Sequence, residues 1–190
     1  MSIGCRGIAD PVPGEPAIPS GFEETAFGGE GLASIDANRI ELEPGVPLSG
    51  VTWTGALPSA PYELEVEFTK RFGNDFPCAI TFPVAGSWLT LVLGGWGGTV
   101  CGLSSLDGED AARNDTRFVR AFAPGARVLA RLEVDEAAVR AWLDGELVVD
   151  VALAGRAVGV RPEMLPSRPL GLAAFATSTV VHRVAWRERR

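Results

Sequence analysis

The sequence predicts an all-β protein in which two antiparallel sheets pack face to face, and three observations support this. Glycine and proline account for 23 and 14 of the 190 residues, and turn-forming residues recur about every eight to twelve positions, as in β-sandwiches. Short apolar runs with a period of two lie between these turns, and no segment has a convincing helical period. With 46% hydrophobic residues, a chain of this length can bury one core, so we expect a single domain.

Residues 1–21 are predicted to form a flexible tail rich in proline and glycine, and residues 22–190 to form the domain. Four prolines between positions 11 and 19 cannot donate backbone hydrogen bonds to a sheet. Cys5 follows Ser2 and Gly4 at close spacing, as in the mature start of a bacterial lipoprotein. Two interpretations stay open: a lipid anchor at Cys5 on an extracytoplasmic protein, periplasmic or at the cell surface, and a cytoplasmic protein without an anchor.

Strands are expected throughout residues 33–103. The clearest is 62–70, where apolar and polar residues alternate strictly, so one face is buried and the glutamates Glu63, Glu65 and Glu67 on the other face water. Two later runs are continuously apolar, which is typical of strands covered on both faces. These runs are 78–82 and 88–93, and the other strands predicted in this half are 34–36, 39–43, 51–54 and 99–103.

A hairpin over residues 138–151 is the strongest local signal in the second half. Asp144-Gly145 separates two alternating runs, and this pair readily adopts the positive φ angles of a type I′ turn. An irregular connection is expected over 153–169. The remaining strands are predicted at 117–122, 127–134, 170–176 and 179–187.

Composition excludes several classes of function. The net charge of -7 repels the phosphates of nucleic acids, and no apolar run approaches the roughly 20 residues of a membrane span. One histidine, His182, and three scattered cysteines cannot supply a zinc site. Cys78 and Cys101 lie in predicted strands, where two buried thiols and a disulfide between them are both open interpretations.

The hairpin, with Trp142-Leu143 before its Asp-Gly turn, resembles that of concanavalin-like jelly rolls, including laminin-G-like domains. More narrowly, residues 40–186 are similar to the bacterial 3-keto-disaccharide hydrolase domain family common in planctomycetes. This likeness rests on four stretches: 62–68, Gly-Asn-Asp-Phe at 73–76, Gly-Gly-Trp-Gly-Gly at 94–98 and 102–108. It implies a jelly-roll enzyme that acts on oxidised glycosides. The family commonly has Gly-Asn-Ser-Gly at the second stretch and uses histidines, so a non-catalytic carbohydrate-binding or protein-interaction module stays an alternative.

The candidate site lies within residues 73–115. Glycoside cleavage usually takes two carboxyl groups about 5–10 Å apart, whereas a 3-keto sugar needs only one base to start an elimination, because the ketone acidifies the neighbouring C–H. The indole of Trp96 is a candidate platform for a sugar ring. The candidate catalytic residues are Asp75, Asp107 and Asp110, and the candidate substrate-binding residues are Asn74, Trp96, Asn114 and Asp115.

Calcium is the only cofactor that the sequence suggests. Its ligands are oxygens, and Asp107, Glu109 and Asp110 crowd one loop. An ordinary polar loop explains the same residues. Both interpretations stay open.

Overall fold

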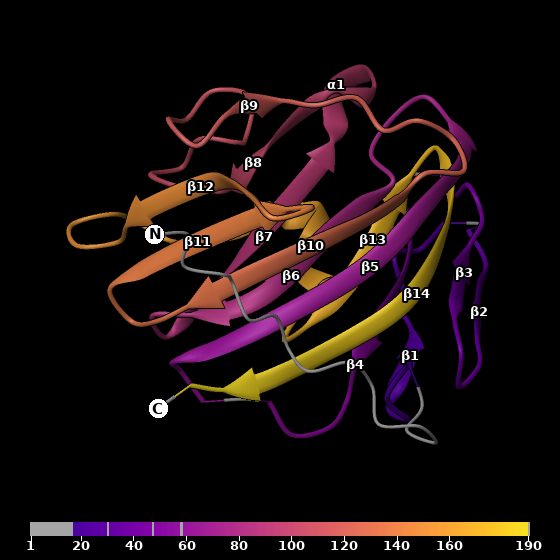
Figure 1. Ribbon diagram of the computed structural model, residues 1–190, viewed down its shortest axis with the longest axis horizontal. Helices are drawn as coiled ribbons and strands as arrows, with labels where there is room; N and C mark the ends of the chain where they lie inside the picture. The colour runs from indigo at the N-terminus through magenta and orange to yellow at the C-terminus, as the bar shows by residue number, and fades with distance from the viewer. Residues whose placement is uncertain (1–16, 30, 47, 58, 190) are drawn as a thin grey trace.

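The computed structural model describes residues 17–29, 31–46, 48–57 and 59–189 as a sandwich of two antiparallel seven-stranded sheets (Figure 1). Sheet A contains, in spatial order, β1 (Phe22–Glu24), β4 (Leu48–Trp53), β13 (Gly171–Phe175), β6 (Cys78–Val84), β7 (Ser87–Gly94), β8 (Val100–Ser104) and β9 (Phe118–Val119). Sheet B contains β12 (Glu146–Ala152), β11 (Ala138–Leu143), β10 (Arg127–Val134), β5 (Tyr62–Gly73), β14 (Thr177–Glu188), β3 (Ile40–Leu42) and β2 (Ala33–Ile35). The predicted all-β jelly-roll sandwich is therefore confirmed.

One large apolar core fills the space between the sheets. Alternate side chains of each strand point into it, such as Ile80 and Leu91 from sheet A and Phe68 and Leu132 from sheet B, all 0% exposed. Ile18, which the sequence analysis placed in the tail, is only 2% exposed and belongs to this core. Residues 17–21 thus pack on the sandwich. The rest of the predicted tail, with Cys5, lies outside the described residues.

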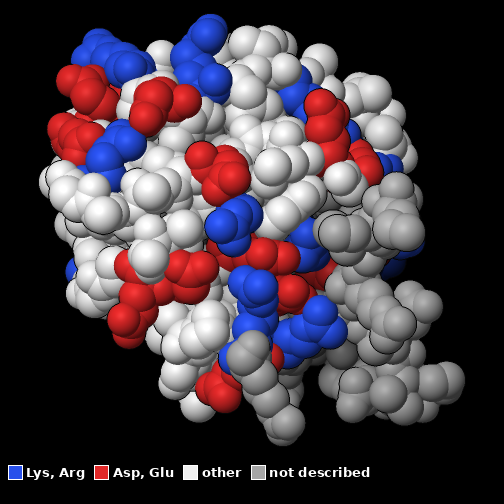
Figure 2. Space-filling model, turned by 60° about the vertical axis from the view of Figure 1, so that its left-hand side comes forward, with Lys and Arg blue, Asp and Glu red and all other residues white. Residues whose placement is uncertain are grey.

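The outer face of sheet B differs from its prediction. Glu63 and Glu65 are 5% and 2% exposed, so the expectation that both face water is wrong. Arg187 lies opposite Glu63 and Arg131 lies opposite Glu65 in the strand register. Acidic and basic side chains also lie next to one another across the face of the molecule in Figure 2. Cross-strand pairing explains the burial, because alternation within β5 says nothing about what its neighbouring strands carry.

Ion pairs connect these buried glutamates to several strands. The Glu63 carboxylate lies 2.6 Å from Arg187 Nη2 and 3.6 Å from Arg131 Nη1. Arg183 Nη1 donates to Glu65 over 2.7 Å. The Arg131 guanidinium also lies over the Trp142 ring, 3.8 Å from its centroid. This ion-pair network joins β5, β10, β11 and β14 across the outer face of sheet B.

The hairpin of β11 and β12 confirms its prediction. Asp144 and Gly145 have φ angles of 50° and 86°, as a type I′ turn requires. The predicted strand 117–122 is shortened to the two residues of β9. The 3₁₀ helix η1 (Pro162–Ser167) lies within the connection that was expected to be irregular.

Cys78 and Cys101 are free, buried thiols, so the disulfide alternative is wrong. Burial raises the pKa of Cys78 well above its usual range and raises the pKa of Cys101 to about 11. Neither sulfur is therefore a ready nucleophile near neutral pH. Separately, no helix among the described residues is long and apolar enough to cross a membrane.

Candidate functional site

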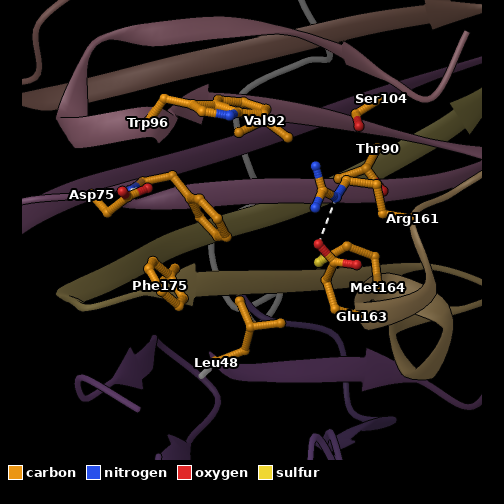
Figure 3. Close-up of a pocket in the computed structure, with 11 residues that line it drawn as sticks. Leu48, Asp75, Thr90, Val92, Trp96, Ser104, Arg161, Glu163, Met164 and Phe175 are labelled. Carbon is orange, nitrogen blue, oxygen red and sulfur yellow. Dashed lines mark hydrogen bonds and ion pairs between the residues drawn. The ribbon is translucent and has the colours of Figure 1, made fainter. Parts of the chain in front are cut away.

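A cavity of about 390 Å³ lies on the outer face of sheet A (Figure 3). Its floor comes from β7, where Leu89 and Leu91 point into the core while Thr90 and Val92 point outward. A second, small apolar cluster covers this outer face and includes Met164 from η1, which is 5% exposed. The cavity is lined by Leu48, Asp75, Phe76, Thr90, Val92, Trp96, Ser104, Arg161, Glu163, Met164 and Phe175.

Trp96 forms one end of the cavity. It belongs to the short segment α1 (Gly95–Gly98), which is a turn more than a helix, because Trp96 and Gly97 have φ angles of 51° and 90°. The Asp75 carboxylate accepts hydrogen bonds from Gly97 N–H over 3.1 Å and from Phe76 N–H over 2.8 Å. Asp75 thereby ties the loop after β5 to the turn that presents the indole, which is 44% exposed.

An ion pair forms the opposite end. Arg161 immediately precedes η1, and its Nε donates to Glu163 Oε1 over 2.5 Å (Figure 3). Arg161 Nη1 also donates to Asp110 Oδ2 over 3.2 Å. The sequence analysis missed Arg161 and Glu163. Pro162 followed by an acidic residue is a helix-start signal, and it could have drawn attention to this segment.

Two hydroxyl side chains, Thr90 and Ser104, lie on the Arg161 side of the cavity (Figure 3). Thr90 Oγ1 is 2.9 Å from Thr81 Oγ1, so these two hydroxyls satisfy each other. Ser104 is 1% exposed, and its Oγ has no hydrogen-bond partner among the described residues. Ser104 therefore places a buried hydroxyl without a hydrogen-bond partner in the wall of the cavity, whereas most buried polar groups are paired.

Residues 105–117 connect β8 to β9 and are called the acidic loop here. None of them lines the cavity. Asp115 accepts two hydrogen bonds from Arg156, over 2.8 and 3.0 Å, and Asp107 accepts one from Arg156 Nε over 2.6 Å. Asp107 also accepts Ala157 N–H over 2.8 Å. The Ala157 N–H and then Arg156 hold the pKa of Asp107 below its ordinary value, and Arg156 does the same for the pKa of Asp115. Both carboxylates therefore stay ionised and are poor proton donors.

Substituting Arg156 with leucine is expected to raise the pKa of both Asp107 and Asp115 towards the value of 3.8 that an unperturbed aspartate has. Each pair stabilises the fold above that pH, and this contribution is lost as the pH falls through the lowered folded-state pKa. Carboxyl ¹³C NMR titration of wild type and Arg156→Leu measures the shift. Arg113→Leu, in the same loop, is the control. Unchanged midpoints in Arg156→Leu would show that Arg156 does not cause the lowering.

The predicted calcium ligands do not fit a metal site. Asp107 binds Arg156, while Asp110 binds Arg161 and the N–H of Ala112. No group of three His, Cys, Asp or Glu side chains in the described part of the chain could hold a metal ion. Calcium needs several oxygens that converge on one point, whereas Asp107 and Asp110 pair with two different arginines. The polar-loop interpretation fits the structure.

The other predicted residues have different positions. The Asn114 side chain donates to Leu103 C=O over 2.7 Å and accepts Thr116 N–H over 3.0 Å, so it supports the acidic loop. Asn74 is exposed and does not line the cavity. His182 pairs with Thr69 Oγ1 in sheet B over 2.9 Å, and burial lowers its pKa. Of the predicted site residues, Asp75 and Trp96 line the cavity. Asp110 does not line it but binds Arg161, which does.

A second hollow, of about 460 Å³, lies beside the acidic loop and shares Arg161 with the cavity. Its charged lining residues are Glu109, Asp110, Arg113 and Arg161. Residues 157–160 form much of the rest. The acidic loop therefore borders this hollow, while its Asp110 reaches the edge of the cavity.

Comparison with solved structures shows a fold shared with carbohydrate-related jelly rolls. The chain is similar to the carbohydrate binding module CBM66 from Bacillus subtilis, with 13% identity over 88% of this chain and 96% of that chain and a TM-score of 0.53. It is similar to the apo Crh5 transglycosylase, with 12% identity over 90% and 80% of the two chains and a TM-score of 0.60. It is also similar to the exoplasmic/lumenal domain of VIP36 in its Ca²⁺/Man-bound form, with 11% identity over 88% and 83% and a TM-score of 0.61.

Sequence comparison identifies no relative. No protein-family model matches the chain, and no curated protein matches it. The likeness to 3-keto-disaccharide hydrolases therefore stays a prediction. At identities of 11–13%, the solved structures show the sandwich fold alone.

Proposed function

We propose that the protein binds a carbohydrate in the cavity, between Trp96 at one end and the Arg161–Glu163 pair at the other. The observation that carries this is the combination, within one cavity, of a half-exposed indole and a charged pair that faces it from the opposite end. A sugar ring has an apolar C–H face that stacks on an aromatic ring and hydroxyls that both donate and accept hydrogen bonds. Two proteins that share the fold, the carbohydrate binding module CBM66 and the Crh5 transglycosylase, also support this proposal.

Binding without catalysis fits the carboxylates of the cavity best. Asp75 uses both its oxygens to accept backbone N–H groups, and Glu163 Oε1 accepts from Arg161. Hydrolysis of an ordinary glycoside would need a proton-donating carboxylic acid and a second carboxylate across the scissile bond. Asp107 and Asp115 do not line the cavity, so they do not supply that second group.

Elimination from a 3-keto glycoside is a second candidate, and the Arg161–Glu163 pair favours it. Glu163 would remove the proton from the carbon between the ketone and the glycosidic carbon, and Arg161 would stabilise the enolate oxygen. When the ketone re-forms, the glycosidic C–O bond breaks and the leaving alkoxide takes a proton from water. Incubation with a 3-keto-glucoside would then release the aglycone, and Glu163→Gln would stop the release. No release by the wild type would leave only the binding function.

Trp96→Ala is expected to weaken binding of a neutral oligosaccharide about tenfold or more, which corresponds to about 1.4 kcal/mol. The substitution removes the apolar surface on which the ring would stack. Isothermal titration calorimetry with β-1,4-linked glucose and mannose trisaccharides measures the affinities. Phe72→Ala is the matched control, because Phe72 is 57% exposed and does not line the cavity. Equal affinities in wild type and Trp96→Ala, or no binding of either sugar by the wild type, would contradict the proposal.

An extracytoplasmic location, with a lipid anchor at Cys5, is part of this proposal. Glycans of the cell surface and its surroundings are found outside the cytoplasm. The domain of VIP36 that shares this fold is its exoplasmic/lumenal domain. Labelling of cells with a fatty-acid analogue, compared between wild type and Cys5→Ala, tests the anchor.

A further inference from the structure

The charges around the cavity are mostly negative. Its charged lining residues are two carboxylates, Asp75 and Glu163, and one guanidinium, Arg161. Arg161 is held by Glu163 over 2.5 Å and by Asp110 over 3.2 Å. Its positive charge is thus already neutralised from two directions before any ligand arrives.

An acidic sugar would meet an unfavourable environment in this cavity. Its carboxylate could bind Arg161 only by displacing Glu163 or Asp110, or by lying next to them as a third negative charge. The second hollow offers no excess of positive charge either, since it holds Glu109 and Asp110 against Arg113 and Arg161. The net charge of the whole chain, -7, adds to the repulsion.

A neutral sugar meets complementary partners in the same place. One oxygen of Glu163 binds Arg161, so its second oxygen can accept a hydrogen bond from a sugar hydroxyl. Arg161 Nη2, which makes no hydrogen bond with the residues that the structure describes, can donate to a neighbouring hydroxyl. Two adjacent hydroxyls on a ring present the matching acceptor and donor.

We propose that the cavity selects neutral sugars over acidic ones and that Glu163 is the residue that rejects the acidic ones. This inference rests on the proposed carbohydrate-binding function. It assigns Glu163 two effects: its charge keeps Arg161 from a ligand carboxylate, and its free oxygen accepts a ligand hydroxyl. Removing the charge while keeping an oxygen acceptor separates the two effects.

The test compares trisaccharides that differ only at C6. β-1,4-linked glucose and mannose trisaccharides are paired with the glucuronate and mannuronate trisaccharides of the same linkage, and calorimetry is run at low and high salt. The wild type is expected to bind each neutral member at least about tenfold more tightly than its acidic partner at low salt, with a smaller ratio at high salt. Glu163→Gln is expected to bind the acidic members about tenfold more tightly than the wild type does, with a smaller change for the neutral ones.

Glu136→Gln is the control, because it makes the same charge change at an exposed residue that lines neither the cavity nor the second hollow. It is expected to leave both affinities of each pair unchanged. Equal or tighter binding of the acidic members by the wild type would overturn the neutral selectivity and leave carbohydrate binding standing. If folded Glu163→Gln binds the acidic trisaccharides no more tightly than the wild type does, the role of Glu163 is overturned. Failure of the wild type to bind any of the four sugars would overturn both proposals.

Discussion

Glu63→Ala is expected to lower the free energy of unfolding by about 3–5 kcal/mol, as measured for other buried ion pairs that lose one partner. Glu63 is 5% exposed and lies within 4 Å of guanidinium nitrogens from Arg131, Arg187 and Arg189. Its removal leaves three guanidinium groups with one acceptor fewer, and one of them, Arg131, is itself buried. Urea unfolding, followed by tryptophan fluorescence, measures the change.

The control for this prediction is Glu136→Ala, an exposed glutamate in the turn before β11. Its expected effect is within about 0.5 kcal/mol, as for most surface substitutions. A loss of less than about 1 kcal/mol in Glu63→Ala would mean that the ion-pair network behaves like exposed salt bridges. The burial of Glu63 would then add little to the free energy of unfolding.

Phe68→Ala is expected to destabilise the fold by about 3–5 kcal/mol, because it leaves a cavity in the centre of the core. Phe68 is 0% exposed, and its ring centroid lies 5.8 Å from that of Phe122. Phe72 lies on the same strand but is 57% exposed, so Phe72→Ala is expected to cost less than about 0.5 kcal/mol. Thermal and urea unfolding of the two variants provide the comparison. Similar losses in both would contradict the difference in burial between the centre and the end of β5.

The strands were predictable because their signal is local. Apolar residues at every second position predict a strand over residues 127–134, and the structure has β10 over that same range. The turn at Asp144-Gly145 was predictable for the same reason, since its residue types select its backbone angles. The burial of Glu63 and Glu65 was not predictable, because it depends on arginines that β10 and β14 place opposite them.

The site was predictable only where its residues are close in the chain. Asp75 and Trp96 flank β6 and β7, so strand pairing brings their loops to the same end of sheet A. Arg161 and Glu163 come from a segment without strand periodicity, and nothing local relates them to Trp96. The acids Asp107 and Asp115 suggested chemistry, yet they pair with Arg156 from a distant part of the chain. Sequence composition alone does not distinguish a reactive carboxylate from a paired one.

The pairing of β5 with β14 has a consequence for how the protein is made. Tyr62 pairs with Glu188 and Gly73 pairs with Thr177, so a central strand of sheet B comes from residues 177–188. During synthesis on the ribosome, β5 and β3 therefore wait for their shared neighbour with unpaired edges. Contacts this distant in sequence favour slow folding, and the nascent chain has to stay free of aggregation until β14 emerges.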